Sequence, residues 1–183
     1  MTKHLARMIL KLCGWRLQGP PPADKKAVVI SAPHTSILDF VFGKLAFMSV
    51  GVPSYILVKK EFFFFPLGLL LRSARVIPVD RGNRENNLVS RLVEEFNKRD
   101  TMYITITPEG SRKKRKRWKK GFLLVARAAG VPVYLGRVDY KGKYCTFGTR
   151  FNPSDDPDED LRYIMSTYRD AHPRHPENFS CGE

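Results

Sequence analysis

Apolar residues follow two different periods along the chain, and the two periods alternate. The first 12 residues have apolar positions at the spacing of one helix face with lysine and arginine between them, which predicts a short basic amphipathic helix: Leu5, Met8, Ile9 and Leu12. Continuous apolar or β-branched runs between turn residues predict strands at 27–31, 55–58, 75–79, 102–107, 131–138 and 144–147. Helical spacing predicts helices at 35–50, 85–99, 118–129 and 158–171, and 62–72 is expected to be a mostly apolar helix or hairpin.

This alternation of strands and helices predicts the fold class. We expect an α/β fold in which a largely parallel central sheet is flanked by helices, with the short amphipathic helix at the N-terminus. The 183 residues fit one domain spanning 1–183. The residues after the last helix contain Pro173 and Pro176, and we expect them to fray.

The charge of the chain limits the classes of partner. Lysine and arginine number 32 against 18 aspartate and glutamate, a net charge of +14, while 43% of residues are hydrophobic. The composition is typical of a globular protein and argues against disordered, collagenous and polytopic membrane proteins. The surplus of positive charge predicts attraction to nucleic acid, to an anionic bilayer, or to phosphorylated and acidic substrates.

Neither a spanning helix nor a disulfide framework is predicted. The longest uncharged stretches, 45–58 and 62–71, contain proline and glycine and are shorter than the roughly 18 apolar residues that a bilayer requires. The basic N-terminus lacks the apolar core of a secretory signal. Cys13, Cys145 and Cys181 form no even or closely spaced set, which favours a reducing compartment.

Three loops follow predicted strands at their carboxyl ends, where α/β sheets bind ligands: 33–39, 78–82 and 108–112. In the first, His34 and Asp39 would lie about 140° apart on a regular helix. If His34 instead precedes the first helical turn, the Asp39 carboxylate reaches back to one ring nitrogen and leaves the other as a general base. The alternative is structural, because Ser36 and Asp39 also have the spacing of an N-terminal capping box.

The other two loops carry residues suited to a phosphate. Glu109 and Arg112 flank a Gly-Ser turn at Gly110 and Ser111, an arrangement that presents a guanidinium and backbone amides to an anion. Pro-Glu-Gly is also an ordinary turn. Arg81 is a second candidate phosphate ligand, or else one half of a surface ion pair with a neighbouring carboxylate.

Residues 112–120 contain eight lysines and arginines, interrupted by Trp118. Such a run first suggests nucleic-acid binding. Because it follows the candidate phosphate loop directly, an anionic bilayer, the phosphates of coenzyme A or an acidic carrier protein are better partners, with Trp118 at a membrane interface. The alternative is a solvated surface with no specific partner. Three interpretations of the aromatic cluster 62–65 remain open: it lines an acyl-chain groove, it dips into a bilayer, or it belongs to the core.

The acidic stretch 155–160 suits a helix N-terminus, and no metal site is expected there.

The order and spacing of these segments resemble a known family. HTSILD, KKEFFFFPLG, IPVDR, PEGSR and GVPV follow one another between Val29 and Val133, over more than half of the chain. This series resembles the glycerolipid acyltransferase family, typified by 1-acylglycerol-3-phosphate O-acyltransferase, with its H-x4-D and P-E-G-[ST]-R motifs.

The resemblance implies a role for each matching position. His34 matches the family's general base, Asp39 the acid that orients it, and Ser36 the serine often found within that motif. The remaining matches are to residues implicated in holding the acceptor's phosphate or lining the site: Arg81, Glu109, Gly110, Ser111, Arg112, Val131 and Pro132. Three positions depart from the family pattern in ways that bear on the acceptor: Pro33 replaces a frequent asparagine, Arg75 a frequent glycine and Leu135 a common proline.

The resemblance therefore implies an acyltransferase of phospholipid biosynthesis. It would move a fatty acyl group from acyl-CoA or acyl-carrier protein to a hydroxyl of a lyso-glycerophospholipid such as 1-acylglycerol-3-phosphate, without cofactor or metal. We expect a cytoplasmic protein, peripheral on the inner face of the membrane, with no nucleic-acid partner. The alternative is a basic nucleic-acid-binding module without catalysis, in which the histidine loop is structural.

Overall fold

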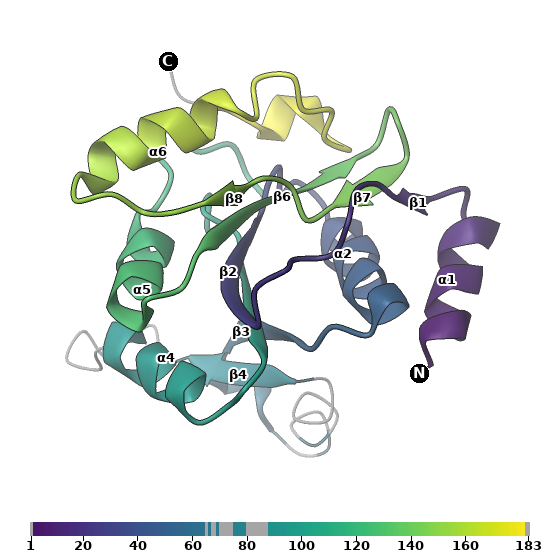
Figure 1. Cartoon of the computed structure of the whole chain (residues 1–183). Helices are drawn as coiled ribbons and strands as arrows, with labels where there is room; N and C mark the ends of the chain where they lie inside the picture. Colours follow the sequence, from purple (N-terminus) through teal and green to yellow (C-terminus); the bar gives the residue numbers. More distant parts are fainter. Residues whose placement is uncertain (1, 65, 67–68, 70–74, 80–87, 182–183) are drawn as a thin grey trace.

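The computed structural model describes residues 2–64, 66, 69, 75–79 and 88–181, and its centre is an eight-stranded sheet (Figure 1). The strands are β1 (Arg16–Leu17), β2 (Lys26–Ser31), β3 (Ser54–Lys59), β4 (Val76–Val79), β5 (Met102–Ile106), β6 (Val133–Asp139), β7 (Tyr144–Thr146) and β8 (Arg150–Phe151). They lie in the order β1-β7-β6-β2-β5-β3-β4, with β8 paired to β6. Of the described strand pairings, those of β6 with β7 and with β8 are antiparallel and the other five are parallel, so the predicted α/β fold with a largely parallel sheet is confirmed.

Helices cover both faces of this sheet. The described residues form α1 (Lys3–Leu12), α2 (Ile37–Val50), α4 (Leu88–Asn97), α5 (Gly121–Ala129) and α6 (Pro157–Ser166), with short 3-10 turns η1 (Lys60–Phe62) and η2 (Pro176–Asn178). Helices α4 and α5 lie on one side of the sheet, α1 and α2 on the other, and α6 crosses beside β8 (Figure 1). In the described part of the chain, no helix has the length and apolar character needed to cross a membrane.

Both faces of strand β2 are buried, which places the sheet at the centre of the fold. Val28 and Ile30 point into the core that α4, α5 and α6 cover, whereas Ala27 and Val29 pack with Phe47 of α2 on the opposite face. All four β2 side chains are at most 2% exposed. A strand with both faces buried needs a continuous apolar run rather than an alternating one, which is the pattern that the sequence has.

The structure corrects several predicted element ends. Helix α2 begins two residues later than predicted because Ser36 is its N-cap, and α6 ends at Ser166 rather than 171. Strands β1 and β8 were not predicted, since two residues show no periodicity. Most of the segment 62–72 lies outside the described residues, as do residues 85–87 of the helix predicted at 85–99.

Two predictions about Trp118 and the C-terminal residues were wrong. Trp118 is 4% exposed, and its indole Nε1–H donates to the backbone oxygen of Ser180 at 3.0 Å. Phe179 packs against the same indole, with ring centroids 6.3 Å apart. Trp118 is therefore part of the packed interior and not at a membrane interface. It fastens the end of the C-terminal segment, where Phe179 and Cys181 pack against the core rather than fray.

Candidate active site

The first and third predicted ligand loops meet in space. Each follows one of the neighbouring parallel strands β2 and β5, so both emerge at the same edge of the sheet. The backbone N–H of His34 donates to Glu109 Oε1 at 2.9 Å and joins the two loops directly. Arg81, in the second predicted loop, lies outside the described residues.

His34 and Asp39 approach each other across the start of α2. The imidazole Nδ1 lies 3.3 Å from Asp39 Oδ2. This contact is possible because His34 precedes the N-cap Ser36, whereas Asp39 is inside the first turn and its carboxylate folds back over the loop. The same Oδ2 accepts hydrogen bonds from the backbone N–H of Thr35 at 2.7 Å and of Ser36 at 2.8 Å.

The capping alternative and the His-Asp pair are therefore both present. Ser36 and Asp39 form a reciprocal capping box at the N-terminus of α2. The box fixes the position of the carboxylate, and this position is within reach of His34. Capping here supplies the orientation that a His-Asp pair requires, so the two readings of the motif do not compete.

Asp39 is a buried carboxylate held in its charged form. Its side chain is 1% exposed, and its second oxygen, Oδ1, accepts a hydrogen bond from the hydroxyl of Tyr140 at 2.6 Å. Burial raises the pKa of Asp39, but hydrogen bonds from His34, Tyr140, Ser36 and Thr35 outweigh it and hold the pKa below its ordinary value. With Nδ1 facing this carboxylate, the second ring nitrogen of His34, Nε2, is the one left to act on a substrate.

Glu109 is buried behind the histidine loop. It is 6% exposed, and among the described residues its Oε2 has no hydrogen-bond partner. Burial, with a contribution from nearby Asp39, raises the pKa of Glu109 to about 8 even though the N–H of His34 opposes the shift. At neutral pH the carboxyl is therefore mainly protonated. Its neighbour Gly110 has a φ of +64°, a conformation that favours glycine.

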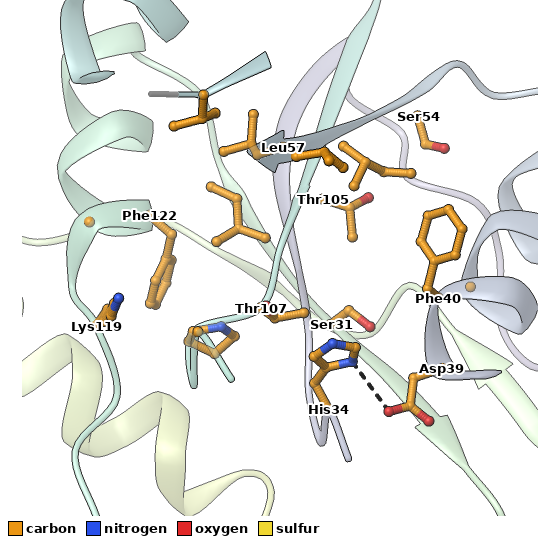
Figure 2. A pocket seen from close by; sticks show the side chains of 18 of the residues that line it. Ser31, His34, Asp39, Phe40, Ser54, Leu57, Thr105, Thr107, Lys119 and Phe122 are labelled. Atoms are coloured by element: carbon orange, nitrogen blue, oxygen red, sulfur yellow. Dashed lines mark ion pairs between the residues drawn. The ribbon is translucent and has the colours of Figure 1, made fainter. Parts of the chain in front are cut away.

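A largely apolar cavity of about 820 Å³ opens beside His34. Figure 2 shows the imidazole next to Ser31 and Thr107, with Asp39 and Phe40 on one side and Lys119 and Phe122 on the other. The volume is typical of a small-molecule site. Its apolar lining comes from helices α2, α4 and α5 and strands β3, β4 and β5: Ile37, Phe40, Phe47, Ile56, Leu57, Val58, Val76, Val79, Leu88, Val89, Leu92, Ile106, Phe122 and Val125.

Three basic residues line the same cavity: Lys44, Arg112 and Lys119. The Lys44 ammonium donates to Ser54, to the backbone oxygen at 2.7 Å and to Oγ at 3.1 Å. Burial, reinforced by the charge of Arg75, lowers the pKa of Lys44 to about 8. Gly110 and Ser111 also line the cavity, so the P-E-G-S-R loop and the histidine loop contribute to one wall.

Family comparison agrees with this geometry. The sequence matches the Acyltransferase family over residues 16–134, which is more than half of the chain. The chain belongs to this family, the glycerolipid acyltransferases. It is an acyltransferase with an acyl donor and an acceptor as substrates. The comparisons found no matching curated protein and no matching solved structure.

Two site residues of this acyltransferase were not predicted from its sequence. Tyr140 follows β6, which is parallel to β2 and ends at the same edge of the sheet. The rule that ligand-binding loops follow the carboxyl ends of parallel strands identified the other loops, and it applies equally to the loop after β6. The sequence therefore contained a signal for Tyr140. Lys44 had no such signal, because its place in the cavity depends on how α2 packs beside the start of β3.

Proposed function

We propose that this acyltransferase moves a fatty acyl group from an acyl thioester to a hydroxyl of a lyso-glycerophospholipid such as 1-acylglycerol-3-phosphate, with His34 as general base. The observation that carries the proposal is the His34–Asp39 contact at the wall of a large apolar cavity. The base and the space for a hydrocarbon chain are adjacent, as the transfer of a fatty acyl group requires.

The reaction needs no covalent enzyme intermediate. His34 Nε2 removes the proton of the acceptor hydroxyl, and the oxygen attacks the thioester carbonyl carbon to form the new C–O bond. The tetrahedral intermediate then collapses as the C–S bond breaks, and the thiolate takes the proton from the imidazolium. The ionised Asp39 stabilises the imidazolium between these two transfers and fixes the ring tautomer.

The lining of the cavity favours a fatty acyl donor and an anionic acceptor. The apolar side chains from helices α2, α4 and α5 suit a hydrocarbon chain. Arg112 and Lys119 line the same cavity and are suited to the acceptor's phosphate. We assign the phosphate to Arg112, which stands in the P-E-G-S-R loop beside the base.

We further propose a peripheral position on the inner face of an anionic membrane. Helix α1 exposes Leu5, Met8 and Leu12, the last at 79%, and carries basic side chains between them. Apolar side chains flanked by cations are typical of helices that lie in a bilayer interface. Residues 113–117 add five consecutive exposed cations in the loop that follows the site.

A thiol-release assay over a panel of lyso-lipids tests the proposed substrates. Acyl-CoA and acyl-carrier protein are offered separately as donors, with lyso-phosphatidic acid, other lyso-phospholipids and glycerol 3-phosphate as acceptors. We expect thiol release that depends on a lyso-lipid acceptor, with the diacyl product identified by mass spectrometry. Lyso-lipid binding without thiol release would mean that the chain keeps the fold without the reaction. Tight binding of generic DNA or RNA without thiol release would favour the nucleic-acid alternative.

A further inference from the structure

Tyr140 contacts the His-Asp pair from outside the segment that matches the family. The match ends at residue 134, whereas Tyr140 directly follows Asp139, the last residue of β6. Its hydroxyl donates to Asp39 Oδ1 at 2.6 Å, a short hydrogen bond between a phenol and a buried carboxylate. The other carboxylate oxygen, Oδ2, faces His34 and the two backbone N–H groups of the loop.

The phenol of Tyr140 is held in place by its surroundings. The ring lies edge-on to Trp15, with centroids 5.1 Å apart, and 6.4 Å from the ring of Phe42. Its backbone N–H donates to the backbone oxygen of His172 at 2.9 Å, which ties it to the C-terminal segment. A ring fixed on two sides keeps its hydroxyl directed at Asp39, so little conformational freedom is lost in forming the hydrogen bond.

We propose that Tyr140 is a positioning residue that keeps Asp39 ionised and oriented toward His34. The inference rests on the proposed role of His34 as general base. Tyr140 is not among the residues that line the cavity, so it acts through Asp39 and not on a substrate. The structure thus has a chain of three side chains, Tyr140 to Asp39 to His34, in which the phenol supports the carboxylate from the side opposite the imidazole.

The predicted effect on pH dependence has a definite sign. Removing the phenol hydroxyl takes a hydrogen bond from the ionised form of Asp39, so the carboxylate binds a proton at higher pH. The Asp39 carboxylate, which then has one hydrogen bond fewer, also holds the His34 imidazolium more strongly. Both changes move the acidic limb of the rate–pH profile upward, and its midpoint belongs to the pair rather than to either residue.

Other titratable groups surround this pair and stay in place when the hydroxyl is removed. Glu109 contacts the backbone of His34, and the buried thiol of Cys145 in β7 lies near Asp39. Arg174 of the C-terminal segment acts on Tyr140 through its charge. None of these groups is altered by replacing the tyrosine with phenylalanine, so a shift in the profile reports the phenol itself.

The experiment compares Tyr140→Phe with a matched control, Tyr134→Phe. Tyr134 lies in β6, the strand that ends just before Tyr140, and its hydroxyl also donates to a carboxylate, that of Asp24, at 2.7 Å. The rate–pH profile of acyl transfer is measured for both variants with the acceptor that the wild type uses best. For Tyr140→Phe we expect the acidic limb to move up by about one pH unit and kcat to fall about tenfold, with the acceptor KM unchanged. We expect the Tyr134→Phe profile to match that of the wild type.

A double-mutant cycle with Asp39→Asn separates positioning from general packing. If Tyr140 acts through Asp39, Tyr140→Phe causes no further loss of rate in the Asp39→Asn background. Equal losses in both backgrounds, or a wild-type profile for Tyr140→Phe, would overturn the inference. If Tyr140→Phe does not fold, 3-fluorotyrosine at position 140 keeps the hydroxyl and makes it a stronger donor, so the acidic limb should move to lower pH; an unmoved limb would overturn the inference equally.

His34→Ala distinguishes failure of this inference from failure of the proposed function. A His34→Ala variant that transfers acyl groups at the wild-type rate contradicts the base assignment, and the role of Tyr140 fails with it. If His34→Ala is inactive while Tyr140→Phe behaves as wild type, only the inference about Tyr140 is wrong.

Discussion

The backbone N–H of His34 donates to Glu109 Oε1 at 2.9 Å, so a single hydrogen bond joins the H-x4-D loop to the P-E-G-S-R loop. The carboxyl that accepts it is buried, and its other oxygen has no hydrogen-bond partner among residues 2–64, 66, 69, 75–79 and 88–181. In this acyltransferase the Glu109 side chain is directed at the histidine loop. It sets the position of one motif relative to the other.

Glu109→Gln should flatten the dependence of stability on pH. The pKa of Glu109 is raised to about 8 in the folded protein, from 4.5 in a free carboxyl. Between these values only the folded state keeps the proton, so the free energy of unfolding falls as pH rises, by at most about 1.4 kcal/mol per unit. The contribution is fully present below about pH 4.5 and lost above about 8. Denaturant unfolding from pH 5 to 8.5 measures the slope for both proteins.

Glutamine cannot ionise, but its amide oxygen still accepts from His34. We therefore also expect Glu109→Gln to retain acyl transfer at neutral pH, since the wild-type carboxyl is mainly neutral there. Equal slopes in the two unfolding series would show that Glu109 is ionised in the folded protein. A loss of transfer with the fold intact would show that the reaction needs its charge.

Asp39→Asn and Ser36→Ala should separate catalysis from helix capping. Both residues belong to the capping box of α2, but only Asp39 contacts His34. Ser36→Ala should cost about 1 kcal/mol of stability and leave kcat near the wild-type value. Asp39→Asn should lower kcat by roughly 10²- to 10⁴-fold, because the amide cannot stabilise the imidazolium. Equal effects of the two variants on kcat would mean that Asp39 has only the structural role.

Arg112→Ala should weaken acceptor binding. Arg112 lines the cavity next to Ser111, and a charge-assisted hydrogen bond to a phosphate contributes about 1.5 to 3 kcal/mol. We expect the KM of the lyso-lipid to rise roughly 10- to 100-fold with little change in kcat. Lys114→Ala, an exposed residue of the same loop outside the cavity lining, is the matched control. An unchanged KM in Arg112→Ala would remove this residue from the phosphate site.

Neutralising the exposed basic loop should reduce binding to anionic vesicles. Replacing Lys113, Lys114, Arg115 and Lys116 by glutamine leaves Arg112 in place. Each cation near an anionic surface contributes roughly fivefold to binding, so the loss should exceed one hundredfold. Sedimentation with phosphatidylglycerol vesicles measures it, and phosphatidylcholine vesicles are the control. Unchanged sedimentation of the variant with phosphatidylglycerol would show that the loop takes no part in membrane binding.

The sequence predicted the sheet well because its central strands are buried on both faces. In β2 and β5 this burial produces apolar runs that stand out from their neighbours. The placement of the histidine loop and the P-E-G-S-R loop at the ligand-binding edge also followed from sequence, since both come after predicted strands of a parallel sheet. The predicted helix ends were less accurate, because a helix end depends on a cap such as Ser36. The side-chain contacts of a cap cannot be read from the periodicity of apolar residues.

The errors have a common physical origin in contacts between distant segments. Trp118 stands among lysines and arginines in the sequence, and these neighbours suggested an interface. In the fold its indole packs against Tyr168 and Phe179, with centroids 5.5 and 6.3 Å away. The hydrogen bond between Tyr140 and Asp39 likewise joins residues 101 positions apart; the sequence indicated that Tyr140 follows a parallel strand but not which residue it contacts. Local pattern records neither contact.

Arg75 illustrates how the structure explains a departure from the family pattern. It occupies the place of a frequent glycine, and its φ of +59° lies in the left-handed region. The backbone here has the conformation that glycine adopts most readily. The departure thus changes the side chain but not the turn.

The rate of thiol release by His34→Ala, compared with that by His172→Ala, tests the role of His34 as general base. Both histidines place Nδ1 near a buried aspartate, His34 at 3.3 Å from Asp39 and His172 at 3.0 Å from Asp139, but only His34 lines the cavity. We predict that His34→Ala lowers kcat by about 10²- to 10⁴-fold with an unchanged unfolding midpoint, while His172→Ala keeps the wild-type rate. A folded His34→Ala protein that releases thiol at the wild-type rate would contradict the assignment of His34 as the general base.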